Sequence, residues 1–147
     1  MNTRTRTRTR TRTWAVAATA ATAALVTAAA PASAAGGGIP WSVTHGTGKA
    51  EGDRRLARSD TGVLELRVDG KLTHTGEGCS SVWTRFQFDL APMPARKQAQ
   101  VCGDGTVDVT IRGTYRPTTT ASVTVCKGTE KPTDCAQWAS ITHWPIG

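Results

Sequence analysis

Hydrophobic and polar side chains alternate through the middle of the chain, between Gly62 and Tyr115. In the run 63–75 the even positions other than Gly70 are apolar or histidine, and the odd positions after Val63 are polar. A period of two is typical of a β-strand with one buried and one solvated face. Two later runs, 82–90 and 107–115, repeat the pattern. The residues expected on the buried faces are Leu64, Leu66, Val68, Leu72, His74, Val82, Thr84, Phe86, Phe88, Leu90, Val107, Val109, Ile111 and Tyr115.

Shorter strands are also expected over 39–45, 97–102, 121–126 and 137 to about 143. Turns rich in glycine, proline and threonine separate the segments, and none of them has helical periodicity. The charged segment 49–60 is expected to be an exposed loop or an edge strand protected by its charges. The pattern therefore predicts an all-β fold, an antiparallel β-sandwich of about seven or eight short strands.

Asp69 and Gly70 have the composition of a two-residue hairpin turn. Such a turn would pair Val68 with Lys71 and so place apolar residues opposite polar ones on one face. A strand that continues through Gly70 keeps the even positions apolar on both sides of the glycine. The register therefore favours one strand of about 13 residues, bent or bulged at Gly70.

Residues 1–34 have the layout of a secretory signal peptide. Threonine and arginine alternate up to Thr13, an uncharged alanine-rich run follows, and small residues end the segment at Ala34. A single membrane span is the alternative, but the run has about 17 residues and few large apolar ones. The arginines are never adjacent, which favours ordinary secretion over twin-arginine export. We expect a flexible N-terminus, 35–38, and a single β-sandwich domain, 39–147.

Removal of this leader changes the charge of the chain. The whole chain carries +7, from 18 basic and 11 acidic residues, and five arginines belong to the leader, so the 113-residue product carries about +2. No basic stripe with interleaved aromatic residues remains, so a nucleic-acid partner is not expected. No later apolar stretch would anchor the processed chain to a membrane. We therefore expect a secreted, extracellular protein.

All four cysteines follow the predicted cleavage site, and an even number in a short exported chain indicates two disulfides. The gaps between them are much larger than those of the close pairs in zinc sites. Three pairings are possible. We favour Cys79–Cys102 and Cys126–Cys135, because short loops close more easily.

The return strand 97–102 complicates the first of these pairings. We expect it to lie beside 81–90 with Ala99 opposite Phe88 and Val101 opposite Phe86. That register leaves Cys79 several residues away from Cys102 along the strand. The segment around Cys79 would then have to fold back.

The segments around the cysteines, 78–83, 101–103, 125–128 and 134–135, give the chain a resemblance to a known group. Most of the mature chain resembles small disulfide-containing β proteins that high-GC Gram-positive bacteria export. The resemblance implies the same compartment and fold. That group has no assigned activity, so it implies no site.

No catalytic residues, cofactor or metal ligands are expected from the sequence. His74 lies on the apolar face of its strand and is expected to be half-buried and hydrogen-bonded. A catalytic set could be assembled from Ser80, His74 and Asp104, but no motif or spacing supports it. We therefore predict that the protein is not an enzyme.

Tryptophan is the more informative residue type. Trp83 lies on the polar face of its strand beside Arg85. A loop or the arginine stem could cover its ring, or the ring could be partly exposed and stack on a sugar or contact a protein. Trp138 and Trp144 flank the last strand, where they could also bind or could close the end of the sandwich. The predicted binding residues are thus Trp83, Arg85, Trp138 and Trp144.

Three functions are considered, and the partner is unknown. The leading hypothesis is a non-enzymatic extracellular binding domain for a polysaccharide, such as a cell-wall glycan, or for another extracellular protein. The first alternative is an inhibitor of an extracellular hydrolase that presents the loop between Cys126 and Cys135, with Lys127 or Lys131 in a specificity pocket. The second alternative is a hydrolase.

Overall fold

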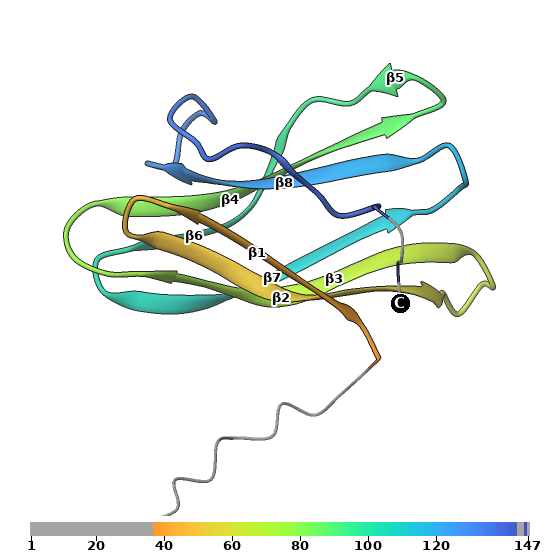
Figure 1. Ribbon diagram of the computed structural model, residues 1–147, viewed down its shortest axis with the longest axis horizontal. Helices are drawn as coiled ribbons and strands as arrows, with labels where there is room; N and C mark the ends of the chain where they lie inside the picture. Colours follow the sequence, from red (N-terminus) through yellow and green to blue (C-terminus); the bar gives the residue numbers. More distant parts are fainter. Residues whose placement is uncertain (1–36, 144–145, 147) are drawn as a thin grey trace, which may run out of the picture. The chain divides into compact units, whose positions relative to one another are not determined.

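Two antiparallel sheets face each other in the computed structural model, which describes residues 37–143 and 146 (Figure 1). The first sheet has the order β1-β2-β3-β7, formed by β1 (Ile39–His45), β2 (Gly48–Arg58), β3 (Leu64–His74) and β7 (Gly105–Thr114). The second has the order β5-β4-β8-β9, and β6 also pairs with β4. Its strands are β4 (Cys79–Phe88), β5 (Ala91–Pro92), β6 (Arg96–Cys102), β8 (Thr120–Lys127) and β9 (Ala139–Ser140). The predicted all-β sandwich is confirmed.

The core forms where the apolar faces of the two sheets meet. From the first sheet it takes Trp41, Val43, Ala50, Leu66, Val68, Leu72, Val109 and Ile111, and from the second Val82, Val101, Ala121, Val123 and Val125. Ile141 and Ile146, which follow β9, complete it. Burying one such aliphatic side chain contributes about 1.5–3 kcal/mol, so this alternation stabilises the sandwich. The buried positions of β3 and β7 are those that the alternation predicts.

β3 continues through Gly70 as one strand, as the register predicts. Its pairing with β2 and with β7 shows no shift at the glycine, so β3 is not bulged there. The backbone of β2 explains the residue type. A Cβ at Gly70 would overlap the carbonyl oxygen of Glu51, and it would also lie 3.0 Å from Trp41 Cζ2.

The prediction for segment 49–60 is wrong. Most of it forms β2, which lies inside the first sheet between β1 and β3 and is neither a loop nor an edge strand. Its inward positions Gly48 and Ala50 are small, and a Cβ at Gly48 would meet Ser80 and Val125 of the other sheet, so the two sheets can pack closely at this point. Arg54 also points inward, is 8% exposed, and donates from Nη1 to the Ser140 carbonyl oxygen of β9 at 3.0 Å.

The predicted register of β6 is also wrong. Ala99 pairs with Val82, and Val101 pairs with Ser80. β4 begins two residues earlier than expected, so Cys79 pairs directly with Cys102 and no fold-back is needed. A shift between Val82 and Trp83 allows the remaining pairs to form.

Two further differences occur at strand ends. Leu90, expected to point inward, is 85% exposed because Asp89 and Leu90 form a turn with positive φ. The last strand is shorter than predicted, since β9 contains only Ala139 and Ser140. Ile141 is nevertheless fully buried, as its parity predicts.

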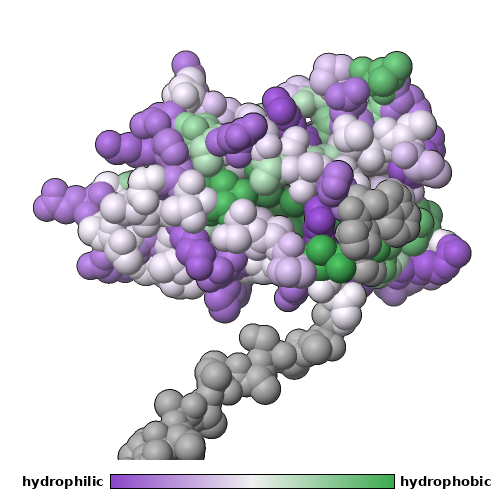
Figure 2. Space-filling view, in the orientation of Figure 1, coloured by the Kyte–Doolittle hydropathy of each residue, from purple (hydrophilic) through white to green (hydrophobic). Residues whose placement is uncertain are grey.

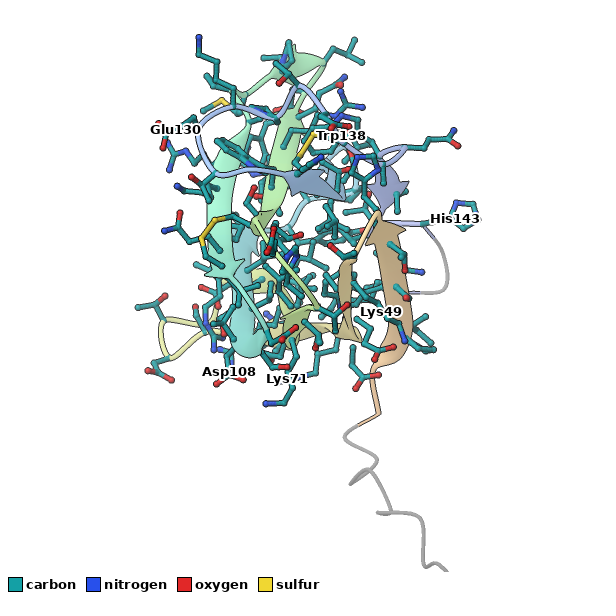
Figure 3. The ribbon with its side chains drawn as sticks, turned by 90° about the vertical axis from the view of Figure 1, so that its left-hand side faces the viewer. Lys49, Lys71, Asp108, Glu130, Trp138 and His143 are labelled. Carbon is teal, nitrogen blue, oxygen red and sulfur yellow. A yellow bond between two sulfur atoms is a disulfide. The ribbon has the colours of Figure 1, made fainter. Side chains whose placement is uncertain are left out.

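Both predicted disulfides are present (Figure 3). Cys79–Cys102 joins the paired strands β4 and β6, and Cys126–Cys135 closes the loop that follows β8. No free cysteine remains. The predicted signal peptide, residues 1–34, lies outside the described residues.

Candidate binding groove

Of the two alternatives for Trp83, a covered ring and a partly exposed one, the structure shows the covered ring. Trp83 lies on the outer face of β4 but is only 8% exposed. The segment after β8 crosses this face: Ser81 Oγ donates to the Gly128 carbonyl oxygen at 2.6 Å, and Thr124 Oγ1 donates to that of Ala136 at 2.8 Å. Trp83 Nε1 in turn donates to Ser81 Oγ at 2.9 Å. The ring is therefore covered by the disulfide-closed loop, the alternative that the sequence leaves open.

Arg85 and Trp138 contact each other, so the surfaces that form this contact are not free to bind a ligand. The guanidinium carbon of Arg85 lies 4.4 Å from the centre of the Trp138 ring, and Arg85 Nε donates to Ser122 Oγ at 3.2 Å. A cation over an indole face is stabilising. Trp138 is half-buried, so one face of its ring is already occupied. Trp144 lies outside the described residues.

A groove of 460 Å³ opens at the side of the sandwich where β4, β6 and β7 adjoin. Phe86 and Phe88 form its apolar part, with parallel rings whose centres are 5.8 Å apart. Phe86 fits against β7 because residue 113 is glycine; a Cβ there would lie 2.6 Å from the ring. At these positions β4 has passed the last residue of β6 that pairs with it, so both rings are only half-buried.

Cationic side chains border this groove. Arg96, Lys97 and Arg112 line it, together with Met93 and Pro94. Lys97 Nζ is held by Gln100 Oε1 and by the Thr129 carbonyl oxygen. Arg96 and Arg112 have no acidic partner among the described residues. Two guanidinium groups thus remain able to bind an anion beside an aromatic surface.

Arg112 is also the last of three arginines in a row across the first sheet. Arg55 pairs with Arg67, and Arg67 pairs with Arg112. Like charges directly opposite each other destabilise a sheet. Carboxylates compensate the first two: Arg55 lies 3.0 Å from Asp69, and Arg67 lies 3.5 Å from Glu65. Arg112, at the groove, lacks such a partner among the described residues.

The described arginines are concentrated in the half of the sandwich where β2 and β7 end. These are Arg54, Arg55, Arg58, Arg67, Arg85, Arg96, Arg112 and Arg116. The same half also carries Lys97 and the acids Asp53, Asp60, Glu65, Asp69 and Asp89. The opposite half carries four lysines, Lys49, Lys71, Lys127 and Lys131, with the six acids Glu51, Glu77, Asp104, Asp108, Glu130 and Asp134. The arginines therefore lie at one end of the sandwich, while carboxylates are present at both ends.

Another pocket, of 360 Å³, lies at the opposite end of the sandwich and is lined by His45, His74, Glu77, Ser80 and Asp134. His74 is buried, not half-buried as expected, and its Nδ1 lies 2.8 Å from Ser80 Oγ. Its Nε2 faces the Glu77 carbonyl oxygen at 3.3 Å. Asp104 accepts from the Gly76 N–H and does not contact His74, so the hypothetical catalytic set is not assembled. His45 Nε2 lies 2.8 Å from Asp134 Oδ1 at the edge of this pocket.

Comparisons with known proteins identify no relative of this chain. No protein-family model matches the chain, and no match is found among the curated proteins or the solved structures. Over residues 37–143 and 146, the structure contains no cluster of three or more metal-ligating side chains. The same residues form no helix long and apolar enough to span a membrane.

Proposed function

We propose that this protein is a secreted, non-enzymatic domain that binds an anionic ligand in the groove lined by Phe86, Phe88, Arg96 and Arg112. The observation that carries the proposal is Arg112, which borders an aromatic surface and lacks an acidic partner among the described residues. An anionic group would bind the guanidinium groups, and an apolar part of the same ligand would cover the phenylalanines. Two disulfides support an extracellular location.

The groove replaces the tryptophan surface that the sequence predicts. A neutral glycan held by Trp83 would need an exposed ring, and this ring is buried. An anionic glycan remains compatible with the groove, as does any other amphiphilic anion. The ligand class is therefore set by the charge at the groove's border and by the aromatic rings inside it.

Binding of 8-anilinonaphthalene-1-sulfonate tests the proposal directly. This aromatic anion fluoresces when it enters an apolar site. We expect the folded protein to bind it, and Phe88→Ser or Arg112→Gln to weaken binding about tenfold, because each removes one of the two recognition elements.

Arg58→Gln is the matched control, since it removes the same charge from the same half at a site outside the groove. Circular dichroism shows whether each variant is folded. Equal affinity in the wild type, Phe88→Ser and Arg112→Gln would place the probe elsewhere and overturn the proposal. If the protein bound the neutral analogue, N-phenyl-1-naphthylamine, as tightly as the sulfonate, the cations would make no contribution to binding.

A second candidate function concerns the disulfide-closed loop. Its beginning is fixed by the bonds to the Gly128 and Thr129 carbonyl oxygens, while Lys131 is exposed. A loop held in this way loses little entropy on binding, which is what a hydrolase inhibitor requires. Inhibition of secreted trypsin-like proteases that is lost in Lys131→Ala would support this function. Lack of inhibition across proteases and amylases would remove it.

A further inference from the structure

The β4–β5 turn presents apolar side chains to solvent beside the groove. Residues 90–95 contain no charge, and Leu90 and Met93 are 85% and 43% exposed. They are two of the three large hydrophobic residues that are exposed in the described part of the chain, the third being Val63. Figure 2 shows a hydrophobic surface at the position of β5 in Figure 1. Exposed apolar clusters of this kind mark contact surfaces.

The turn holds Leu90 outward in a defined conformation. Asp89 and Leu90 have φ of 46° and 71°, a left-handed conformation that is unusual for leucine. Pairing of Phe88 with Ala91 and the bond from Met93 N to the Phe86 carbonyl oxygen, at 2.8 Å, close the turn. A two-residue hairpin turn of this type requires positive φ at both residues, so the turn places Leu90 at its tip and away from the core.

Cations surround this turn. Arg96 and Lys97 follow it directly, and Arg112 lies across the groove, which Met93 also lines. The one acid of the turn, Asp89, accepts from Thr118 Oγ1. An exposed apolar turn with neighbouring cations matches the chemistry of an anionic membrane surface, where acyl chains lie beneath phosphate groups.

From the exposure of Leu90 and Met93 and the neighbouring cations, we propose that the β4–β5 turn docks reversibly on an anionic lipid surface, with these two side chains in the interface and lipid phosphates at Arg96 and Arg112. The inference rests on the proposed function, because it makes the lipid phosphate the anion of the groove. A soluble acidic polysaccharide would account for the arginines but would leave Leu90 without a role. A membrane accounts for both.

Co-sedimentation with vesicles tests the docking. The processed protein is expected to bind vesicles of equal parts phosphatidylcholine and phosphatidylglycerol, and not vesicles of phosphatidylcholine alone. Leu90→Ser/Met93→Ser is expected to lower the partition coefficient about tenfold or more. Arg96→Gln/Arg112→Gln is expected to lower it by about fivefold for each charge.

Val63→Ser is the control, because it removes a comparably exposed apolar side chain from the β2–β3 turn in the other sheet. It should bind vesicles like the wild type. Failure to bind anionic vesicles, or equal binding by Leu90→Ser/Met93→Ser and the wild type, overturns the docking.

The naphthalene sulfonate probe separates the two proposals. If it still binds and still depends on Arg112 while vesicles are not bound, the groove is retained and the membrane is excluded. Binding of a soluble polyuronate in preference to the vesicles would likewise replace the membrane by a glycan. If neither probe nor vesicles bind, both proposals fail.

Discussion

Gly70 has no side chain, and the packing of β2 and Trp41 against β3 depends on this. It lies between Gly52 and Val109 in the first sheet, with the Trp41 ring against it. We predict that Gly70→Ala lowers the free energy of unfolding by about 2–3 kcal/mol, because the methyl group overlaps Trp41 and the β2 backbone. Urea denaturation measures this. Gly37→Ala, which has open space around it, is the control and should have no effect.

Arg54 tests whether a buried charge is needed in this core. Burial lowers the pKa of its guanidinium, so the charged form is less stable in the folded protein than in the unfolded chain. Nη1 bonds to the Ser140 carbonyl oxygen, but Nε is buried without a partner among the described residues. We predict that Arg54→Met, which keeps the apolar stem, changes the free energy of unfolding by no more than about 1 kcal/mol.

The comparison variant is Arg54→Ala. It also loses the packing of the stem, so it should cost about 2 kcal/mol more than Arg54→Met. Thermal or urea unfolding of both proteins gives the difference. A large and equal loss in both variants would show that the bond to Ser140, and not the stem, holds the two sheets together here.

Individual side chains show how far the sequence pattern reaches. Parity places Trp83 on the outer face of its strand correctly, but it does not reveal that a loop forty residues later in the chain covers this face. Parity also places Leu90 inward, and the chain turns away before that position is reached. Arg54 points inward although it is charged, because the Ser140 carbonyl oxygen of the opposite sheet accepts a hydrogen bond from its guanidinium group. For Trp83 and Arg54 a contact with a distant part of the chain decides where the side chain lies, and for Leu90 a local turn does; the alternation of apolar and polar residues contains neither.

Among the elements, the disulfide-closed loop has a role that can be isolated. We predict that Cys126→Ser/Cys135→Ser lowers the free energy of unfolding by about 2.7 kcal/mol, the chain-entropy value for a closure of about ten residues. It should also expose Trp83, since the closed loop covers this ring. Acrylamide quenching of tryptophan fluorescence, compared with the same variant carrying Trp83→Phe, measures the exposure.

The other disulfide is the control for this effect. Cys79→Ser/Cys102→Ser removes a longer closure, worth about 3.4 kcal/mol, but leaves the loop after β8 in place. It should therefore destabilise the protein at least as much while Trp83 stays protected. Equal quenching of Trp83 in both variants would contradict the covering role of the loop.

Strand identity could be predicted from the sequence better than strand pairing. The alternation in β3 and β7 is long enough to define both strands, whereas β6 has few apolar residues to fix its register. Its true pairing is set by Cys79 opposite Cys102 and by the irregularity at Val82. The groove cannot be predicted from the sequence, because its position also depends on the register of β6. Phe86 and Phe88 look like ordinary core residues until β6 is known to end its pairing before them.

At the scale of the whole molecule, the arginines are unevenly distributed along the strands. Strand order brings arginines from β2, β3, β4, β6 and β7 into one half, although they are scattered through the sequence. Figure 3 looks onto the other end, where Lys49, Lys71 and Asp108 are labelled. The net charge of about +2 over residues 35–147 hides this uneven distribution, so composition alone gives no reason to expect an anionic ligand.

The two ends should act independently at physiological salt. Lys71 pairs with Asp108 of β7, four residues before Arg112, so Lys71 and Arg112 lie roughly 13 Å apart along the strand, more than the Debye length of about 8 Å at 0.15 M ionic strength. Arg96→Gln/Arg112→Gln and Lys49→Gln/Lys71→Gln remove the same net charge from opposite ends. We predict that, at this ionic strength, only the arginine variant loses affinity for 8-anilinonaphthalene-1-sulfonate, by at least about tenfold. At 0.01 M salt, where the Debye length reaches about 30 Å, the lysine variant should also weaken binding measurably. Equal losses in both variants at 0.15 M would mean that net charge, and not the placement of the guanidinium groups, governs the attraction.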